Sequence, residues 1–500
     1  MNKQISKGAI VSYFAIFFNI ISGIFYTPWM IHTIGDSEYA LYTLAMSVIN
    51  IFVVDFGLGA ATSRFLSIYY AEGREEEANN FLGMTLKLYL AIDTIIFMVL
   101  LVLLFFLEII YVKLSAEELE IFRNLYVIVA FYTIISFPIL NFNGILMAKE
   151  QFVAVKLCGL FNKIITTILI IIALLYGGNV YALVFINAIV NVLFGVVKWL
   201  LIKNNRVKFN IRYRNRELEK ELFNFSVWTT IVEVMQRCIF SIAPTFLARF
   251  VNSTEIVYFS LASLIEGYVW LVGDAINGMF LPKVAKLDTE NNSQIHILNL
   301  MIKVGKFQLF VIGMIVVVFI LICDDFVYLW MGKDYEKVSI CASMIIIPLL
   351  LDVPQQIGKT TVMIKDKIKE QAIVYMVMAV TYIFLAMILT PYYGVIGTSL
   401  AVMLAYFVRS VLLSMLYHNI LKLNMKIFYK KLYIRWLMTA GSSFILGYIL
   451  LQNILYDGIF GFLVKGFVCV LIYVMLSWGI FFTNAEKNVL LKLLKEKLKC

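Results

Sequence analysis

Long apolar runs separated by short polar segments dominate this 500-residue chain and limit what it can fold into. About 20 apolar residues in a helix span the roughly 30 Å hydrocarbon core of a bilayer. Fourteen such runs occur, at residues 8–30, 40–63, 83–107, 122–147, 155–176, 180–202, 223–248, 256–282, 303–323, 338–358, 371–390, 394–417, 432–452 and 458–483. Hydrophobic residues make up 62% of the sequence, more than a soluble chain of this length can bury. The sequence therefore predicts an all-α integral membrane protein with about fourteen transmembrane helices, the first retained rather than cleaved as a signal peptide.

The runs form two similar sets, because residues about 216 positions apart match. The matches are Pro28 with Pro244, Pro138 with Pro354, Met147-Ala148-Lys149 with Met363-Ile364-Lys365, Gly178 with Gly394 and, at slightly larger offsets, Glu38 with Glu255 and Asp55 with Asp274. Proline removes a backbone donor and bends a helix, so the paired prolines predict bends at equivalent places. Internal repeats among membrane spans are typical of transporters that open alternately to the two sides of a bilayer.

Six spans in each copy give two six-helix lobes of the same orientation. The predicted organisation is an N-lobe at 1–202, a basic cytoplasmic linker at 203–222, a C-lobe at 223–420, a helix pair at 421–483 and a cytoplasmic tail at 484–500. Apolar and polar residues alternate from Val207 to Tyr213, which predicts a short extended stretch at the lipid headgroups. In the tail, leucines from Leu490 to Leu498 share one helical face, which predicts an amphipathic helix on the inner leaflet.

Lysine and arginine are distributed unequally between the segments that join the spans. With the N-terminus in the cytoplasm, the cytoplasmic segments hold 31 of these residues and the opposite side holds 5. This bias follows the positive-inside rule and predicts that both termini are cytoplasmic. It also accounts for the net charge of +10 without a nucleic-acid partner.

Several short motifs lie at the ends of the predicted helices. Thr27–Gly73 contains a proline late in the first helix, Ile34-Gly35 and Glu38-Tyr39 in the first outer turn, and Asp55-Phe56-Gly57-Leu58-Gly59 at the end of the second helix. NGILMAKEQF (Asn143–Phe152) follows the fourth helix, and YGGNVYAL (Tyr176–Leu183) precedes the sixth. In these motifs, and in its 6+6+2 helix count, nearly the whole chain resembles the polysaccharide repeat-unit flippases, of the O-antigen and capsule type. These belong to the multidrug/oligosaccharidyl-lipid/polysaccharide exporter superfamily. Ala40 stands where that family usually has glycine, which implies a slightly different turn.

The resemblance implies a transporter and not an enzyme. Its substrate would be an undecaprenyl-diphosphate-linked oligosaccharide, moved from the inner to the outer leaflet for surface polysaccharide synthesis. The resemblance also implies alternating access coupled to a proton or sodium gradient, as in an antiporter, without a cofactor. The expected location is the inner (plasma) membrane of a bacterium, and a polysaccharide polymerase is a candidate partner.

Cations inside the predicted spans are candidates for binding a diphosphate. Arg237 lies about 21 Å along the seventh span, too deep to reach the headgroups easily. Its planar guanidinium can grip phosphate oxygens with two donors, and Glu233, one turn earlier, can hold it until substrate arrives. A purely structural ion pair explains the same two residues. Lys163 and Arg409 lie about 12–14 Å from the cytoplasmic ends of their spans, and either a cavity wall or a reach to the headgroups explains them.

Carboxylates inside the spans are candidates for ion coupling, because such groups bind a proton or sodium. Asp93 and Glu266 lie nearest the middle of their spans. Asp55 and Asp274 occupy matched places in the two lobes, where a hydrogen bond at a helix end or between the lobes is the simpler interpretation. Asp352 is a fifth carboxylate, without an assigned role.

Other classes of protein fit the sequence less well. A drug exporter of the same superfamily usually has twelve spans, while a lipid II flippase shares fourteen. A major-facilitator transporter normally carries a basic motif after its second span, which Ser63–Arg74 does not match. A membrane glycan polymerase or ligase normally needs a long outer loop, and none is predicted. The six cysteines and three histidines are dispersed, so no metal site is expected.

Overall fold

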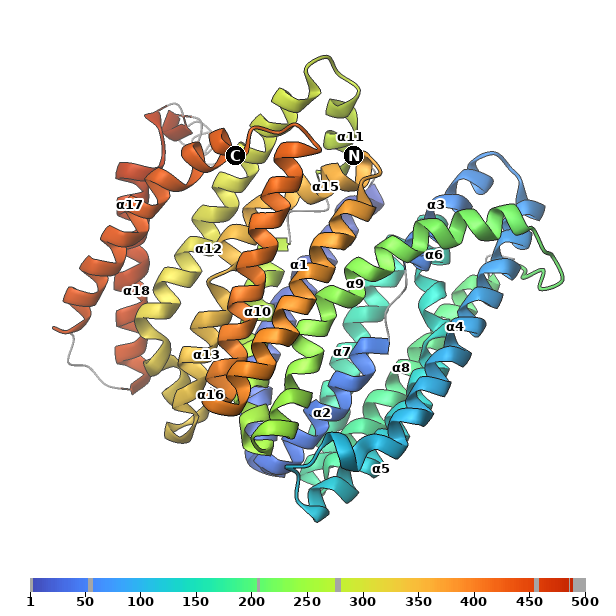
Figure 1. The fold of residues 1–500 in the computed structure, drawn as a ribbon, viewed down its shortest axis with the longest axis horizontal. Helices are drawn as coiled ribbons and strands as arrows, with labels where there is room; N and C mark the ends of the chain where they lie inside the picture. Colours follow the sequence, from blue (N-terminus) through green and yellow to red (C-terminus); the bar gives the residue numbers. More distant parts are fainter. Residues whose placement is uncertain are drawn as a thin grey trace. The chain divides into compact units, whose positions relative to one another are not determined.

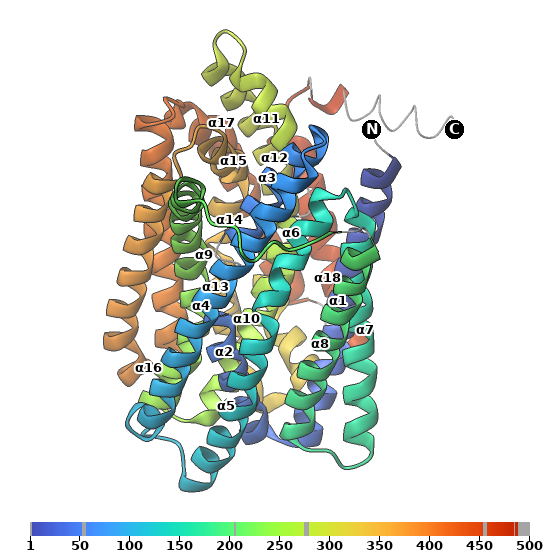
Figure 2. The same cartoon turned by 90° about the vertical axis from the view of Figure 1, so that its right-hand side faces the viewer.

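The computed structural model describes residues 3–52, 57–204, 207–274, 280–453, 458–484 and 486–488. Throughout these residues the regular secondary structure is helical (Figures 1 and 2). The first helices are α1 (Lys3–Ile34), α2 (Asp36–Phe52), α3 (Leu58–Ala71), α4 (Glu75–Ile110), α5 (Ala116–Ser136), η1 (Pro138–Leu140), α6 (Asn141–Ala148), α7 (Phe152–Leu175) and α8 (Val180–Asn204). The remainder are α9 (Arg216–Phe250), α10 (Ser253–Asp274), α11 (Leu281–Asp288), α12 (Ser293–Met331), η3 (Lys333–Tyr335), α13 (Glu336–Ile346), α14 (Leu349–Asp352), η4 (Val353–Gln355), α15 (Gln356–Ile364), α16 (Ile368–Asn419), α17 (Met425–Leu451), α18 (Gly458–Leu476) and η5 (Ser477–Phe481).

Twelve helical stretches among the described residues are long and apolar enough to cross a membrane, so this is a multi-pass membrane protein. The predicted all-α fold is confirmed, but the count of fourteen is not. The predicted run 40–63 falls on α2 and α3, which lie on either side of residues 53–56. The runs 371–390 and 394–417 form the single long element α16, which consists of two helices meeting at a kink at Gly394 (φ 58°, ψ −135°). Glycine reaches this backbone region without steric cost.

The chain divides into two compact units. Unit 1 is Met1–Ser260 with Tyr375–Ala401, and unit 2 is Leu261–Val374 with Val402–Cys500. Unit 1 therefore contains the first copy of the repeat, the beginning of the second copy and the first half of α16. Unit 2 contains the remainder of the second copy and the final helix pair.

Within unit 1, α3 and α6 pack together closely. A side chain at Gly144 would place its Cβ 2.6 Å from the carbonyl oxygen of Gly59, so glycine is required at this crossing. The segment after α8 packs onto the same region, because Val207 and Phe209 contact a buried cluster that includes Phe81. Residues 207–210 have no regular secondary structure, and their apolar side chains contact protein rather than only the headgroups that we expected.

The fourth span of each copy is interrupted where prolines are paired. In the first copy, Pro138 opens η1 between α5 and α6. In the second copy, Pro354 lies in η4 between α14 and α15. Proline cannot donate the i→i−4 hydrogen bond, so the helix tightens or breaks at these points. The predicted bends are confirmed here, whereas Pro28 and Pro244 lie inside continuous helices, α1 and α9.

The final helix pair packs against α12 in unit 2 (Figure 1). A side chain at Gly313 of α12 would overlap the Trp436 indole of α17, so glycine permits this close approach. The Trp436 Nε1–H donates a hydrogen bond to the Tyr473 hydroxyl of α18 at 3.0 Å. These contacts make α17 and α18 an integral part of unit 2.

Candidate functional site

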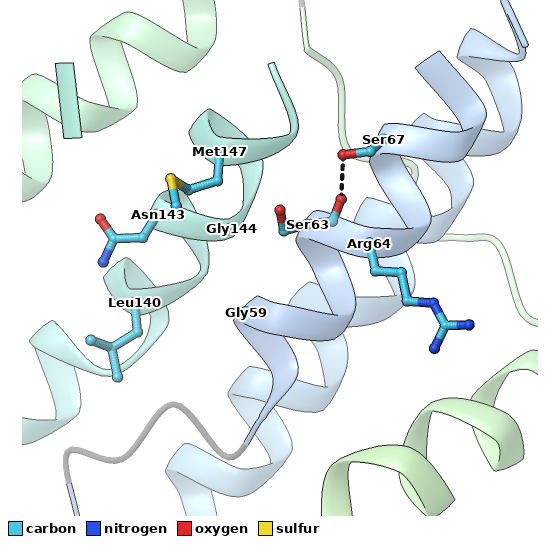
Figure 3. A pocket seen from close by; sticks show the side chains of 8 residues that line it. All are labelled: Gly59, Ser63, Arg64, Ser67, Leu140, Asn143, Gly144 and Met147. Carbon is cyan, nitrogen blue, oxygen red and sulfur yellow. Dashed lines mark hydrogen bonds between the residues drawn. The ribbon is translucent and has the colours of Figure 1, made fainter. Parts of the chain in front are cut away.

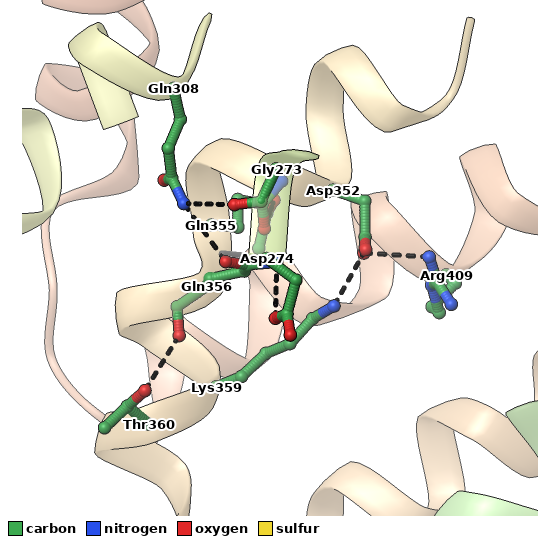
Figure 4. A network of polar contacts seen from close by, with 10 residues as sticks. Gly273, Asp274, Gln308, Asp352, Gln355, Gln356, Lys359, Thr360 and Arg409 are labelled. Atoms are coloured by element: carbon green, nitrogen blue, oxygen red, sulfur yellow. Dashed lines mark hydrogen bonds and ion pairs between the residues drawn. The ribbon is translucent and has the colours of Figure 1, made fainter. Parts of the chain in front are cut away.

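A buried group of charges lies at the interrupted fourth span of the second copy, inside unit 2 (Figure 4). Arg409 Nη2 lies 2.8 Å from Asp352 Oδ1, and each side chain is only 1% exposed. Lys359 Nζ lies 2.8 Å from Asp352 Oδ2. One carboxylate therefore holds two cations in a place from which solvent is nearly excluded.

The broken helix positions these groups. Asp352 is the last residue of α14, immediately before η4, and Lys359 lies two turns later on α15. Arg409 comes from the second half of α16 and contacts the face of the Tyr406 ring, with its Cζ 4.2 Å from the ring centroid. Discontinuous helices in transporters commonly mark a binding or coupling site, because they bring polar groups into the membrane interior.

Glutamine side chains continue this polar region across the same unit (Figure 4). Gln308 Nε2 donates to Gln356 Oε1 at 3.0 Å. Gln356 Nε2 in turn donates to Asp274 Oδ1 at 3.3 Å. On another side, Gln355 Nε2 donates to the Tyr429 hydroxyl at 3.0 Å. The glutamine contacts thus link α10, α12 and α15, and η4 with α17, in a polar network next to the buried charges.

Glu266 supplies a second carboxylate to this group. Its side chain is buried, and its charge interacts with those of Arg409 and Asp352. With Glu266 ionised, two carboxylates oppose two cations, so the four charges balance. Removing any one of them would leave an uncompensated charge in a region of low dielectric constant, which is costly.

Three of the sequence-predicted site residues meet in this network, namely Arg409, Glu266 and Asp274. Arg409 is only 1% exposed, so its side chain lies in the protein interior in this structure. The cause is Asp352, which offers it a buried carboxylate. Its predicted role in substrate binding stays a prediction.

The other predicted residues fall elsewhere. Arg237 and Glu233 lie on α9 in unit 1, where Arg237 is exposed and Glu233 is half-buried. Lys163 is exposed on α7, and Asp93 is buried on α4. Asp55 lies outside the described residues. The structure therefore does not gather all of the predicted residues into one described group.

Sequence reasoning missed Lys359, which falls just after the predicted span 338–358, and gave Asp352 no role. The repeat held a usable signal. The residues 216 positions earlier are Ser136 and Asn143, which carry no charge. Charges present in the second copy and absent from the first mark a specialisation of the second copy.

A hollow of about 500 Å³ lies between α3 and α6 in unit 1 (Figure 3). It is lined by Gly59, Ser63, Arg64, Ser67, Leu140, Asn143, Gly144 and Met147. Two hydroxyls, one amide and one guanidinium suit a polar or anionic group. The guanidinium of Arg64 extends away from α6, on which Asn143 lies.

Comparison with protein families decides the class of this chain. The model of a family described as "Polysaccharide biosynthesis protein" matches residues 5–269, more than half of the 500 residues. This chain belongs to the polysaccharide biosynthesis protein family. A search of curated proteins found no match to this family member.

Solved structures share the fold of this polysaccharide biosynthesis protein. A structure titled "Lipid II flippase MurJ, inward closed conformation" aligns with a TM-score of 0.72 and 18% identity, over 94% of this chain and 98% of that chain. An inward-facing multidrug resistance MATE family transporter of the MOP superfamily aligns with a TM-score of 0.63 and 14% identity, over 82% and 99%. The Vibrio cholerae MATE transporter VcmN in its bent form aligns with a TM-score of 0.56 and 12% identity, over 84% and 98%. These neighbours are transporters and flippases, not enzymes.

Proposed function

We propose that this protein moves an undecaprenyl-diphosphate-linked oligosaccharide from the inner to the outer leaflet of a bacterial plasma membrane. The observation that carries this proposal is the polysaccharide biosynthesis family match over residues 5–269. It occurs in a chain whose helices are suited to cross a membrane many times. A polar headgroup cannot cross the hydrocarbon core unaided, so a protein of this family inside the membrane fits the task of carrying it.

Chain coverage favours a lipid-linked substrate over a drug. The lipid II flippase aligns over 94% of this chain, against 82% and 84% for the two multidrug transporters. A difference of this size is similar to the length of the final helix pair, α17 and α18. A lipid II flippase is therefore the nearest alternative, and a drug exporter comes after it. None of the three solved structures described above is titled as a glycan polymerase or ligase.

Substrate recognition is assigned to Arg237. Its guanidinium is exposed on α9 and can take two oxygens of a diphosphate at once. Glu233 lies four residues earlier, on the same face of the helix, where it can hold the guanidinium between cycles. Lys163 is also exposed and adds a second positive charge for the same anion in unit 1.

Ion coupling is assigned to the buried network of unit 2, with Glu266 as the residue that takes up a proton or sodium ion. The four charges balance only while Glu266 is ionised. A cation bound there would leave the group with one excess positive charge, which would weaken the hold of Asp352 on Arg409 or Lys359. Binding of one ion would thus change the packing at the broken helix, and this coupling is what an exchange transporter needs. Asp274 and Asp93 are secondary candidates.

The orientation proposed from the charge distribution has both termini in the cytoplasm. The turns α4–α5 and α9–α10 then face outward. This orientation places the linker after α8 on the cytoplasmic side.

The direct test is deletion of the gene in its host, followed by assay of surface polysaccharide and of lipid-linked repeat units. We expect loss of surface glycan, with intact repeat units accumulating on the inner leaflet. Restoration by the unchanged chain is the control. Unchanged surface polysaccharide after the deletion would favour a drug exporter instead. Unpolymerised repeat units on the outer leaflet would indicate a polymerase.

A further inference from the structure

Two turns at the same end of unit 1 touch each other, although they belong to different copies of the repeat. The first joins α4 to α5 in the first copy, and the second joins α9 to α10 in the second copy. Polar groups from both turns bond to each other. The α9–α10 turn is the outward end of the second copy in the orientation proposed above.

Glu118 is the centre of these contacts. It completes a capping box at the start of α5, with its Oε2 accepting a hydrogen bond from the Ser115 backbone N–H at 2.9 Å. Its Oε1 accepts a hydrogen bond from the Ser37 hydroxyl of α2 at 2.9 Å. The carboxylate also bonds to the Ser253 hydroxyl of α10. The capping box fixes the carboxylate within reach of both serines.

Ser37 and Ser253 are 216 residues apart, so they are equivalent positions in the two copies. Each lies at the start of the second helix of its own copy. The Glu118 carboxylate therefore bonds to equivalent serines of the two copies.

Arg249 makes the second connection. Its Nη1 donates to the carbonyl oxygens of Ile109 at 2.8 Å and Ile110 at 3.2 Å, at the C-terminal end of α4. These carbonyls lack partners within their own helix, and a cation at a helix C-terminus is favourable. Close by, the Tyr111 and Thr245 hydroxyl oxygens lie 3.4 Å apart.

We propose that unit 1 contains an outer latch that opens and recloses in every transport cycle. This outer latch consists of Glu118 and Arg249 with their partners, which are Ser37, Ser253 and the last carbonyls of α4. This proposal rests on the proposed function, since alternating access requires the outer ends of the two copies to separate. The bonds of Arg249 to the last carbonyls of α4 cross between the copies and are exposed, so water can replace them when they break. Inside the second copy, the bond from the Val395 N–H to Glu255 is buried. The molecule should therefore part at the outer latch and keep each copy intact.

The first experiment locks the latch reversibly. Ser37→Cys and Ser253→Cys are introduced together after replacement of the six native cysteines, which leaves Glu118 and Arg249 unchanged. A short, reducible, bifunctional thiol reagent then bridges the two positions. We expect at least a tenfold loss of lipid-linked oligosaccharide transport in the bridged protein, reversed by reduction.

The matched control bridges two helices of one copy on the same face. Asn124 of α5 and Tyr181 of α8 are hydrogen-bonded at 3.4 Å and both belong to the first copy. The Asn124→Cys/Tyr181→Cys protein should keep its transport rate when it is bridged. Full transport by the bridged Ser37/Ser253 pair would overturn the latch.

A second measurement needs no substrate, so its failure is distinct from failure of the proposed function. Spin labels at Lys113 and Tyr392, exposed residues of the two copies in unit 1, report the separation of the outer ends by pulsed electron resonance. In the Glu118→Ala/Arg249→Ala variant we expect a larger share of long distances, with no change for Asn124→Ala. An unchanged distribution would overturn the proposal. A shifted distribution in a protein that transports no lipid-linked glycan would retain the latch and reject the function.

Discussion

The Glu255 carboxylate accepts a hydrogen bond from the Val395 backbone N–H at 2.6 Å. Glu255 lies in the first turn of α10, and Val395 follows the kink at Gly394. The first copy repeats this relationship, because Glu38 of α2 accepts a bond from the Val180 N–H at the start of α8, at 3.0 Å. Acids that match along the sequence therefore make matching contacts in space, and each acid fixes the start of a distant helix within unit 1.

Glu255→Ala should lower the free energy of unfolding by about 2 kcal/mol, because the loss leaves a buried N–H without its charged acceptor. Thermal unfolding in detergent measures this change. Glu38→Ala serves as the matched variant and should cost less, since its bond is longer and less buried. Equal effects of the two substitutions would contradict the assigned difference in burial.

The buried pair of Asp352 and Arg409 should respond to substitution in a non-additive way. Asp352→Ala should cost about 3–5 kcal/mol, because it strands two cations in the protein interior. Arg409→Leu combined with Asp352→Ala should recover part of that loss, as measured by a double-mutant cycle on thermal stability. The Lys465–Asp325 pair, where Asp325 is 43% exposed, is the control, and its removal should cost about 0–1 kcal/mol. Additive losses at Asp352 and Arg409 would argue against a coupled pair.

The sequence was sufficient to predict the helices and the internal repeat. Apolar runs of membrane length and paired prolines act locally, and both are visible without knowledge of distant contacts. The count of spans was harder, since a glycine such as Gly394 permits either a kink or a separate helix. A further limit is that residues forming an ion pair can lie far apart in the sequence. Asp352 and Arg409 are 57 residues apart, and no local pattern connects them.

The candidate site was therefore predicted only in part. Glu266 and Arg409 stood out because charges are rare inside spans, and both lie in the network of unit 2. Lys359 did not stand out. Its place beside Asp352 depends on where the chain resumes a helix after η4, which apolar periodicity does not reveal. The roles of Arg237 and Lys163 stay predictions.

The ion pair between Lys306 and Glu486 should make stability depend on pH. Burial raises the pKa of the Glu486 carboxyl, but hydrogen bonds from Lys306 and Thr483 outweigh burial and hold it below its ordinary value of 4.5. A lowered folded-state pKa gives stability that is complete above the ordinary pKa and is lost as pH falls through the folded pKa. Unfolding temperatures between about pH 5 and pH 3 should fall more steeply in the unchanged protein than in Glu486→Gln. Parallel curves would show that this pair does not contribute.

Glu266→Gln should separate transport from its driving ion. The amide keeps the shape of the side chain and cannot be ionised, so the charge balance with Asp352, Arg409 and Lys359 is fixed. We expect transport that no longer responds to an imposed proton or sodium gradient, measured in vesicles loaded with lipid-linked oligosaccharide. Asp93→Asn is the matched variant in unit 1. An unchanged ion response in Glu266→Gln would exclude Glu266 as the coupling residue.

Arg237→Ala should abolish transport while the protein still folds. The side chain is exposed on α9, so its removal leaves no buried cavity and should change the unfolding temperature little. Arg237→Lys keeps the charge and loses the planar fork that grips two phosphate oxygens, so it should retain only part of the activity. Complementation of a deletion strain, with membrane levels of each variant measured in parallel, gives the readout. Normal surface polysaccharide from a well-expressed Arg237→Ala protein would remove Arg237 from the substrate site. Glu233→Gln removes the carboxylate that can hold the Arg237 guanidinium, so releasing the guanidinium costs less. A higher affinity for substrate in that variant would show that substrate must displace Glu233 in order to bind Arg237.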